Sequence, residues 1–232
     1  MVPKASFSIW LLVLGTFGTA VRTMPLEPLE QLGTLGTLGT LGTPAPAPGS
    51  EAPAQFRVRL ETTKGAIVIE CVRAWAPLGA DRFYELVASG YYNDSAIFRI
   101  RPNTWVQFGI NGDPKIAQSW RPRTIADDPF QPAHPNVRGT VFFAWAVPNG
   151  RTTQVVINLR DNRETHDQEP FVPFGRVIEG MEVADALFDE YGEAAGGGIR
   201  AGKQDPVFQN GNAYLRKNFP KLDYINTARI VP

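Results

Sequence analysis

The chain of 232 residues is 43% hydrophobic and 11% aromatic, which is ordinary for a soluble globular protein with one filled core. Lysine plus arginine and aspartate plus glutamate both total 23. The net charge of zero excludes recruitment by a strong overall field to nucleic acid or to an anionic membrane surface. The single cysteine, Cys71, excludes an intramolecular disulfide and a cysteine-based metal site, and we expect it to be a core residue.

The first 23 residues are typical of a secretory signal peptide. Lys4 supplies a positive charge, residues 7–17 form an apolar run, and residues 18–20 (GTA) offer small side chains for cleavage. The run is shorter than the about 20 residues of a membrane-spanning helix, although an uncleaved anchor or a transit peptide stays open as an alternative. We expect an extracytoplasmic protein, in a secretory lumen, in a periplasm or secreted, without stable membrane insertion after signal cleavage.

Residues 24–54 predict a low-complexity linker. Residues 32–43 repeat Leu-Gly-Thr four times, and residues 44–54 read PAPAPGSEAPA. Such a composition favours extended chain and cannot bury a core. It is either a linker without specific use or a spacer that holds a domain away from a membrane or a partner. One folded domain is expected over residues 55–232.

Alternating apolar and polar residues in that domain predict short strands. The expected strands cover residues 56–61, 66–72, 95–101, 105–108, 139–146, 153–159, 171–177 and 223–231. Helical spacing predicts one helix from Pro77 to a stop at Gly90 and a second over residues 179–189. Residues 115–137 and 191–212 are expected to be loops, and residues 213–222 are ambiguous. We therefore predict a mainly β fold, a closed eight-stranded antiparallel barrel capped by two helices.

The segment FRIRPNTWVQFGINGDP, residues 98–114, places an arginine inside an apolar strand. Arginine keeps its proton and is rarely buried without a partner. Arg99 must therefore reach solvent, pair with an acid such as Asp113, or face a pocket where its donors meet a ligand. Both histidines, His134 and His166, lie in polar stretches without a companion, so we expect them to be solvated and predict no metal site.

Several blocks occur in an order that is recognisable: FRIRP, QFG, GTVFFAWA, PNGRTTQVVINLRDN and PFGRVIEGMEVAD. From about Phe56 to the last strand, the chain resembles the cyclophilin-type peptidyl-prolyl isomerases, and their bacterial-like branch in particular. The resemblance implies a barrel with a helix at each end and a substrate groove on its outer wall. It also implies proline-containing peptides and unfolded proteins as partners and no cofactor. We further expect a monomer.

The resemblance implies two catalytic residues, the arginine Arg99 and the groove glutamine Gln107. The substrate-binding positions that it implies are Trp105, Ala144, Trp145, Gln154, Val156 and Phe171. Phe171 stands where the family has a groove histidine. Four further positions depart from the family: Thr104 and Val156 replace pocket phenylalanines, Trp105 replaces a methionine and Trp145 an asparagine. No aromatic residue replaces the tryptophan that binds the family's cyclic-peptide inhibitor, since Thr165 and His166 stand nearest.

Isomerisation of an X-Pro bond requires neither a nucleophile nor a metal. The barrier of about 20 kcal/mol comes from amide resonance, so a groove that binds the twisted amide more tightly than the planar one lowers it. Arg99 can donate to the pyramidal proline nitrogen, while Gln107 and Gln154 hold the flanking peptide groups. We therefore predict an isomerase for exported proteins, with activity weakened or altered by the changed pocket. The alternatives are a catalytically weak module that binds proline peptides, and a barrel that binds a small apolar ligand inside.

Overall fold

The computed structural model describes residues 51–198 and 203–232. The strands are β1 Gln55–Thr62, β2 Gly65–Val72, β3 Ser95–Ala96, β4 Arg99–Arg101, β5 Trp105–Phe108, β6 Thr140–Phe143, β7 Val155–Asn158, β8 Pro173–Glu179 and β9 Tyr224–Val231. The helices are α1 Pro77–Ala88, α2 Pro114–Trp120, α3 Arg163–His166, α4 Met181–Asp185 and α5 Asp205–Asn218, with 3-10 turns η1 Arg73–Trp75 and η2 Ala194–Gly196. The predicted signal peptide and the linker up to residue 50 lie outside the described residues.

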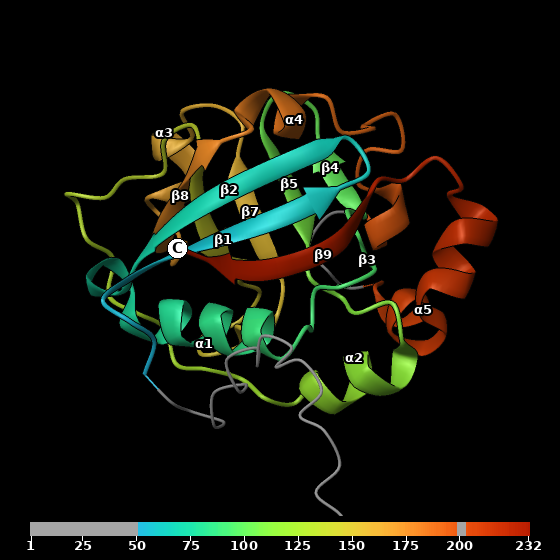
Figure 1. Ribbon diagram of the computed structural model, residues 1–232, viewed down its shortest axis with the longest axis horizontal. Helices are drawn as coiled ribbons and strands as arrows, with labels where there is room; N and C mark the ends of the chain where they lie inside the picture. Colours follow the sequence, from blue (N-terminus) through green and yellow to red (C-terminus); the bar gives the residue numbers. More distant parts are fainter. Residues whose placement is uncertain (1–50, 199–202) are drawn as a thin grey trace, which may run out of the picture. The chain divides into compact units, whose positions relative to one another are not determined.

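All nine strands belong to one antiparallel sheet, in the order β3-β9-β1-β2-β8-β6-β7-β5-β4 (Figure 1). The chain enters it through the β1–β2 hairpin, in which Thr62 pairs with Gly65 at the turn. Gly65 has a φ of 134°, a conformation that residues with a Cβ rarely adopt. The mainly β architecture therefore agrees with the prediction from alternating residues.

The closed barrel of eight strands is corrected to an open sheet of nine. The expected strand over residues 95–101 is broken at Ile97 and Phe98, so that β3 pairs with β9 and β4 with β5. These two halves are the two ends of the sheet, and no ladder joins them in the part of the chain that is described. The break has a packing reason, because Ile97 is buried in the main core while Phe98 is buried in a second one.

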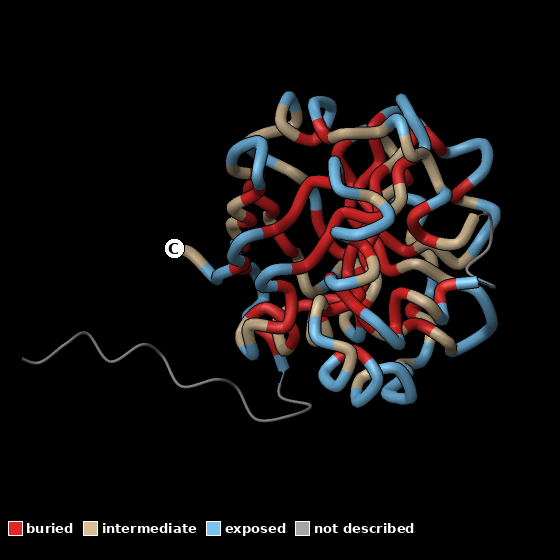
Figure 2. Tube along the Cα trace, turned by 90° about the vertical axis from the view of Figure 1, so that its right-hand side faces the viewer, coloured by how far each residue is buried: buried red, intermediate tan, exposed pale blue. Residues whose placement is uncertain are grey.

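Helices α1 and α4 contribute to the same core as the sheet, and lie below and above the strands in Figure 1. Pro77 begins α1 as predicted, and the helix buries Phe83, Leu86 and Val87. The second predicted helix is shorter than expected, since Gly180 takes a left-handed conformation (φ 85°) and α4 spans only Met181–Asp185. Figure 2 shows that buried chain gathers in the interior and exposed chain in the outer loops.

Three helices were missed, the short α3 and, in segments expected to be loops or ambiguous, α2 and α5. Helix α2 begins where the side chain of Asp113 accepts a hydrogen bond from the amide of Lys115. Helix α5 contains Gly211, whose φ of 53° and ψ of −141° interrupt the helix and blur its sequence signal. Both helices pack with β3 and η2 around a second cluster of buried residues, which includes Phe98, Ala195 and Phe208.

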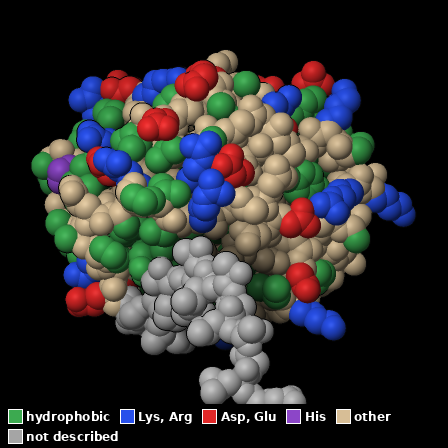
Figure 3. Space-filling view, viewed as in Figure 1, with side chains coloured by type: hydrophobic (Ala, Val, Ile, Leu, Met, Phe, Trp, Pro, Cys, Tyr) green, Lys and Arg blue, Asp and Glu red, His purple; other side chains and the backbone are tan. Residues whose placement is uncertain are grey.

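Cys71 is fully buried, as predicted, and burial raises the pKa of its thiol well above the ordinary value. On the face shown in Figure 3, acidic and basic side chains are interspersed, in keeping with the balanced charge of the sequence. None of the helices within residues 51–198 and 203–232 has the length and apolar character needed to cross a membrane.

Candidate active site

Four side chains form a row across neighbouring strands. Arg99 on β4 pairs with Gln107 on β5, Gln107 pairs with Val156 on β7, and Val156 pairs with Phe142 on β6. Directly paired residues in an antiparallel sheet project to the same face. The next residues along these strands, among them Ile100 and Val106, belong to the main core. The row therefore lies on the outer face of the sheet, where the groove was expected.

Arg99 is held from two sides. Its Nη1 donates to Oε1 of Gln107 at 2.9 Å, and its Nε and Nη2 donate to Oε2 of Glu193 at 3.1 and 2.5 Å. The guanidinium carbon also lies 4.9 Å from the ring centroid of Trp105, a cation–π distance. The arginine thus both pairs with an acid and faces a groove. The acid is Glu193, whereas Asp113, the partner suggested from the sequence, caps α2.

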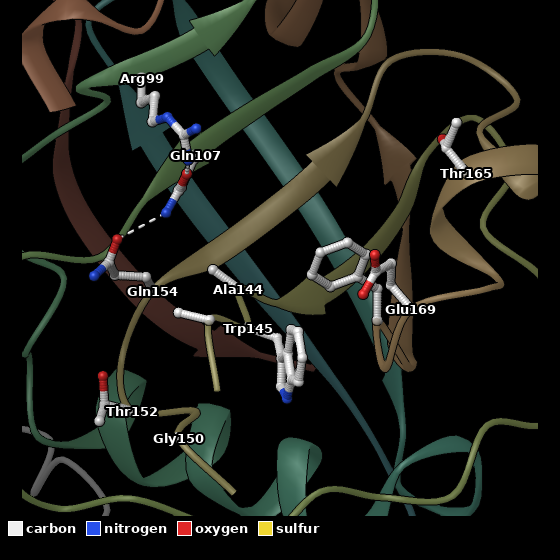
Figure 4. A pocket seen from close by; sticks show the side chains of 11 residues that line it. Arg99, Gln107, Ala144, Trp145, Gly150, Thr152, Gln154, Thr165 and Glu169 are labelled. Carbon is white, nitrogen blue, oxygen red and sulfur yellow. Dashed lines mark hydrogen bonds between the residues drawn. The ribbon is translucent and has the colours of Figure 1, made fainter. Parts of the chain in front are cut away.

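The two predicted glutamines lie in one hydrogen-bonded chain (Figure 4). Nε2 of Gln107 donates to Oε1 of Gln154 at 2.7 Å. Gln154 and Gln204 exchange amide hydrogen bonds of 2.9 and 3.1 Å. Since each amide is fixed by its neighbour, the orientation of Arg99 is coupled to that of the whole chain of amides.

An apolar cavity of about 200 Å³ adjoins Arg99. Its lining residues are Arg99, Trp105, Gln107, Phe142, Ala144, Trp145, Val156, His166 and Phe171. A second, more polar cavity of about 370 Å³ shares Arg99 and continues past Gln154 to Thr152 and Glu169. In Figure 4, Arg99, Gln107 and Gln154 follow one another along one side of this second cavity, with Glu169 and Thr165 on the other. All the predicted site residues therefore line one of two adjoining cavities.

The walls of the apolar cavity differ from those expected from the substitutions relative to the family. Thr104 is absent from the cavity lining, and its hydroxyl donates to the carbonyl of Pro102 in the β4–β5 turn. Phe142 and His166 supply walls that sequence reasoning missed. Phe142 was hidden inside an apolar run in which neighbouring side chains face opposite sides of the sheet, and only the register places it beside Val156.

The prediction that His166 is solvated is wrong. Its ring is 9% exposed and lies edge-on to Phe142 and Phe171, with centroid distances of 5.3 and 5.1 Å. Its Nδ1 lies 3.0 Å from Oδ1 of Asn158, which also accepts from Asn162, so the neutral ring carries its proton on Nδ1. Burial lowers the pKa of His166 to about 4. His134 instead stacks on Trp75 at 4.2 Å.

We expect His166 to make folding stability depend on pH. Between pH 6.5 and 4 the unfolded chain binds a proton that the folded protein excludes, so the free energy of unfolding rises with pH and falls on acidification. The contribution is at most about 3 kcal/mol. Urea unfolding of the wild type and of His166→Gln at pH 7 and pH 4.5 measures it. The pH dependence of the free energy of unfolding should shrink in His166→Gln and persist in His134→Gln. An equal dependence in the wild type and both variants would contradict the role of His166.

Trp145 is anchored from outside the groove. Its Nε1 donates to Oδ2 of Asp127 at 3.3 Å, and the same oxygen accepts from the amide of Asn149. Asp127 in turn lies 3.2 Å from Nε of the buried Arg151. The loop over residues 121–137, expected to be a surface segment, therefore fixes one wall of the pocket.

The described residues contain no group of three or more His, Cys, Asp and Glu side chains that could hold a metal ion. Arg99, which lines both cavities, is instead paired with Glu193. What the arrangement offers chemically is a fixed guanidinium, a row of amides and an apolar recess.

Comparison with known proteins shows the family. Residues 57–203 match the family model described as cyclophilin type peptidyl-prolyl cis-trans isomerase. Peptidyl-prolyl cis-trans isomerase A of Dickeya dadantii is 33% identical over 147 residues, which are 61% of this chain and 75% of that protein. A peptidyl-prolyl cis-trans isomerase of Acinetobacter baylyi is 29% identical over 142 residues, 60% of this chain and 74% of that protein.

The fold is also similar to a solved structure. A cyclophilin type peptidyl-prolyl cis-trans isomerase of Cryptosporidium parvum has a TM-score of 0.55 at 18% identity, covering 77% of this chain and 98% of that one. The family match spans more than half of the chain and includes the row from Arg99 to Val156. The chain belongs to the cyclophilin-type peptidyl-prolyl cis-trans isomerase family.

Proposed function

We propose that the protein accelerates cis–trans isomerisation of X-Pro bonds during the folding of exported proteins. The observation that carries the proposal is the position of Arg99: a guanidinium 11% exposed, fixed by hydrogen bonds, at the junction of an apolar and a polar cavity. A donor of this kind can stabilise the twisted amide at low reorganisation cost, because it is already oriented before the peptide binds.

The apolar cavity would hold the proline ring. Phe142, Phe171 and His166 pack against one another there, so the ring would meet a preformed wall. With the proline immobilised, rotation has to occur on its N-terminal side, and the polar cavity along Gln107 and Gln154 would receive the flanking peptide groups. Arg99 would then donate to the proline nitrogen as it becomes pyramidal.

Two further features support the proposed substrate and location. The Cryptosporidium parvum isomerase has also been solved in the presence of the dipeptide Ala-Pro, in a chain with a TM-score of 0.52 and 20% identity to this one. We infer the same ligand class, proline-containing peptides, for this groove. Export rests on the sequence of residues 1–23, with Lys4 ahead of an apolar run and small residues after it. We propose that the protein acts there as a monomer.

The test is the exchange rate of a short peptide with one Ala-Pro bond, measured by NMR with and without the purified protein. We expect a concentration-dependent rise in the exchange rate above the uncatalysed value, whose time scale is tens to hundreds of seconds at 25 °C. Titration of the same peptide, followed by amide shifts of groove residues, reports binding separately. Binding without faster exchange would replace the proposal by a proline-peptide binding module, and absence of both would overturn it.

A further inference from the structure

We propose that Glu193 is a positioning residue, whose carboxylate holds the guanidinium of Arg99 in the orientation that catalysis needs. This inference rests on the proposed isomerase function and deepens it. Glu193 is absent from the linings of both cavities and its carboxylate bonds the Nε and Nη2 edge of Arg99, so it would act on the substrate only through the arginine.

The hydrogen bonds leave part of the guanidinium available. Arginine has five N–H groups, and three of them take part in the bonds to Glu193 and Gln107. The Nε and Nη2 edge is occupied by one oxygen of Glu193, which leaves one N–H each on Nη1 and Nη2 without a hydrogen-bond partner among the described residues. Because the carboxylate occupies one edge, it restricts the rotation of the guanidinium and sets where the remaining donors point.

The ion pair is shielded from solvent. The side chains of Arg99 and Glu193 are 11% and 20% exposed, whereas an exposed pair such as Arg163 and Asp161 is 58% and 49% exposed. Water screens the second kind of pair, so its net contribution is small. The Arg99–Glu193 pair is held by a stronger electrostatic interaction. Loss of the carboxylate would leave the largely buried charge of Arg99 without its ion-pair partner.

The backbone that carries Glu193 lies directly against Arg99. The amide of Ile100 donates to the carbonyl of Gly192 at 2.9 Å. A Cβ on Gly196 would lie only 3.0 Å from both Cβ and Cδ of Arg99, closer than ordinary packing allows. Ala195, between them, is buried in the second core beside Phe98. The segment 191–198 is thus attached to β4 by a hydrogen bond, by close contact and by a core residue.

The far end of the amide chain is fixed by the same part of the protein. Gln204 is 4% exposed and bonds Gln154 just before α5 begins. The family match ends at residue 203, so Gln204 and α5 lie beyond it. The chain of side-chain hydrogen bonds from Glu193 through Arg99, Gln107 and Gln154 to Gln204 therefore begins and ends in residues that follow α4. Both ends lie a few positions from members of the second core, Ala195 and Val207.

The experiment compares kcat and KM for X-Pro exchange in the wild type and in Glu193→Gln, Glu193→Ala and Glu193→Asp. We expect kcat to fall about 10-fold in Glu193→Gln and up to about 100-fold in Glu193→Ala, the range for displacing a catalytic group by about 1 Å. KM should stay within about twofold, because the peptide-binding surfaces are unchanged. Glu193→Asp, which keeps the charge, should recover part of the loss.

A second readout does not depend on activity. In the wild type, the Nε–H resonance of Arg99 should be slow to exchange with solvent, and it should broaden or vanish in Glu193→Ala. The matched control is Glu190→Gln, three residues earlier. The Glu190 side chain is 73% exposed, and its ion pair with Lys221, at 3.9 Å, is a long one. This variant should keep the wild-type kcat, KM and Nε–H resonance.

The outcomes separate this inference from the proposed function. An active wild type whose kcat is unchanged or raised in Glu193→Gln and Glu193→Ala would overturn the positioning role and leave the isomerase function intact. A wild type that does not accelerate exchange would overturn the proposed function, and the positioning role with it. A fall in kcat accompanied by an equal fall in Glu190→Gln would show a general effect of the segment and would also overturn the specific role of Glu193.

Discussion

Replacing Arg99 by alanine is expected to lower kcat/KM for X-Pro exchange by about 10²- to 10³-fold, the usual cost of removing a donor that stabilises charge in a transition state. Among the described residues, the guanidinium is the one cationic group that lines both cavities. Its loss would remove the proposed donor to the proline nitrogen and would also end the hydrogen bond to Gln107. The measurement is the exchange rate of an Ala-Pro peptide by NMR, at peptide concentrations below and above those that saturate the wild type.

Two variants control for indirect effects. Arg99→Lys keeps a positive charge near Glu193. Lysine lacks the planar set of donors with which arginine bonds Gln107 and Glu193 at once, so kcat should remain low, as in Arg99→Ala. Arg101→Ala removes an exposed arginine two residues along the same strand, outside both cavities, and should leave kcat/KM unchanged. Wild-type rates in Arg99→Ala, or an equal loss in Arg101→Ala, would show that the reaction does not depend on this guanidinium.

Replacing Arg151 by methionine is expected to lower the free energy of unfolding by about 3–5 kcal/mol, the usual cost of removing one partner from a buried ion pair. The side chains of Arg151 and Asp128 are 1% and 2% exposed, with Nη1 and Oδ2 separated by 3.0 Å. Asp128 also accepts from the amides of Leu78 and Gly79 in the first turn of α1. Without the arginine, a buried carboxylate would keep only these neutral donors.

Urea unfolding at pH 7 measures this change, and two variants sharpen its interpretation. Arg151→Met combined with Asp128→Asn should recover part of the loss, because no uncompensated charge is left buried. Arg121→Met removes a pair with Asp205 whose side chains are 50% and 57% exposed, and should cost at most about 1 kcal/mol. A loss in Arg151→Met no larger than that in Arg121→Met would contradict the assignment of Arg151 as a central support of the fold.

The Arg151 variant also links stability to the groove. Asp127, which bonds Trp145 at the pocket wall, lies beside Arg151. Such a buried cluster could not be anticipated from the sequence, because residues 121–137 contain no periodic pattern and look like a solvent-exposed loop. Its function as an internal support follows from contacts between residues more than twenty positions apart.

Local pattern determined much of the fold. Alternation along β1 and β2, the proline at the start of α1 and the glycine turns each arise from the conformational preferences of a few adjacent residues, which a sequence displays directly. The resemblance of the ordered blocks also placed Arg99, Gln107, Gln154 and Phe171 in one groove before their geometry was known. Those residues lie on regular strands or beside them, where register follows from alternation.

Tertiary structure decided the rest. The break at Ile97 and Phe98, which opens the sheet, depends on two cores that compete for neighbouring side chains. The burial of His166 and the contact between Glu193 and Arg99 depend on which segments meet in space. Arg99 and Glu193 stand 94 positions apart, and contacts of this kind leave no periodic signal in the chain. The sequence alone therefore predicted Arg99 as the catalytic donor, whereas only the packed structure revealed the acid that holds its guanidinium.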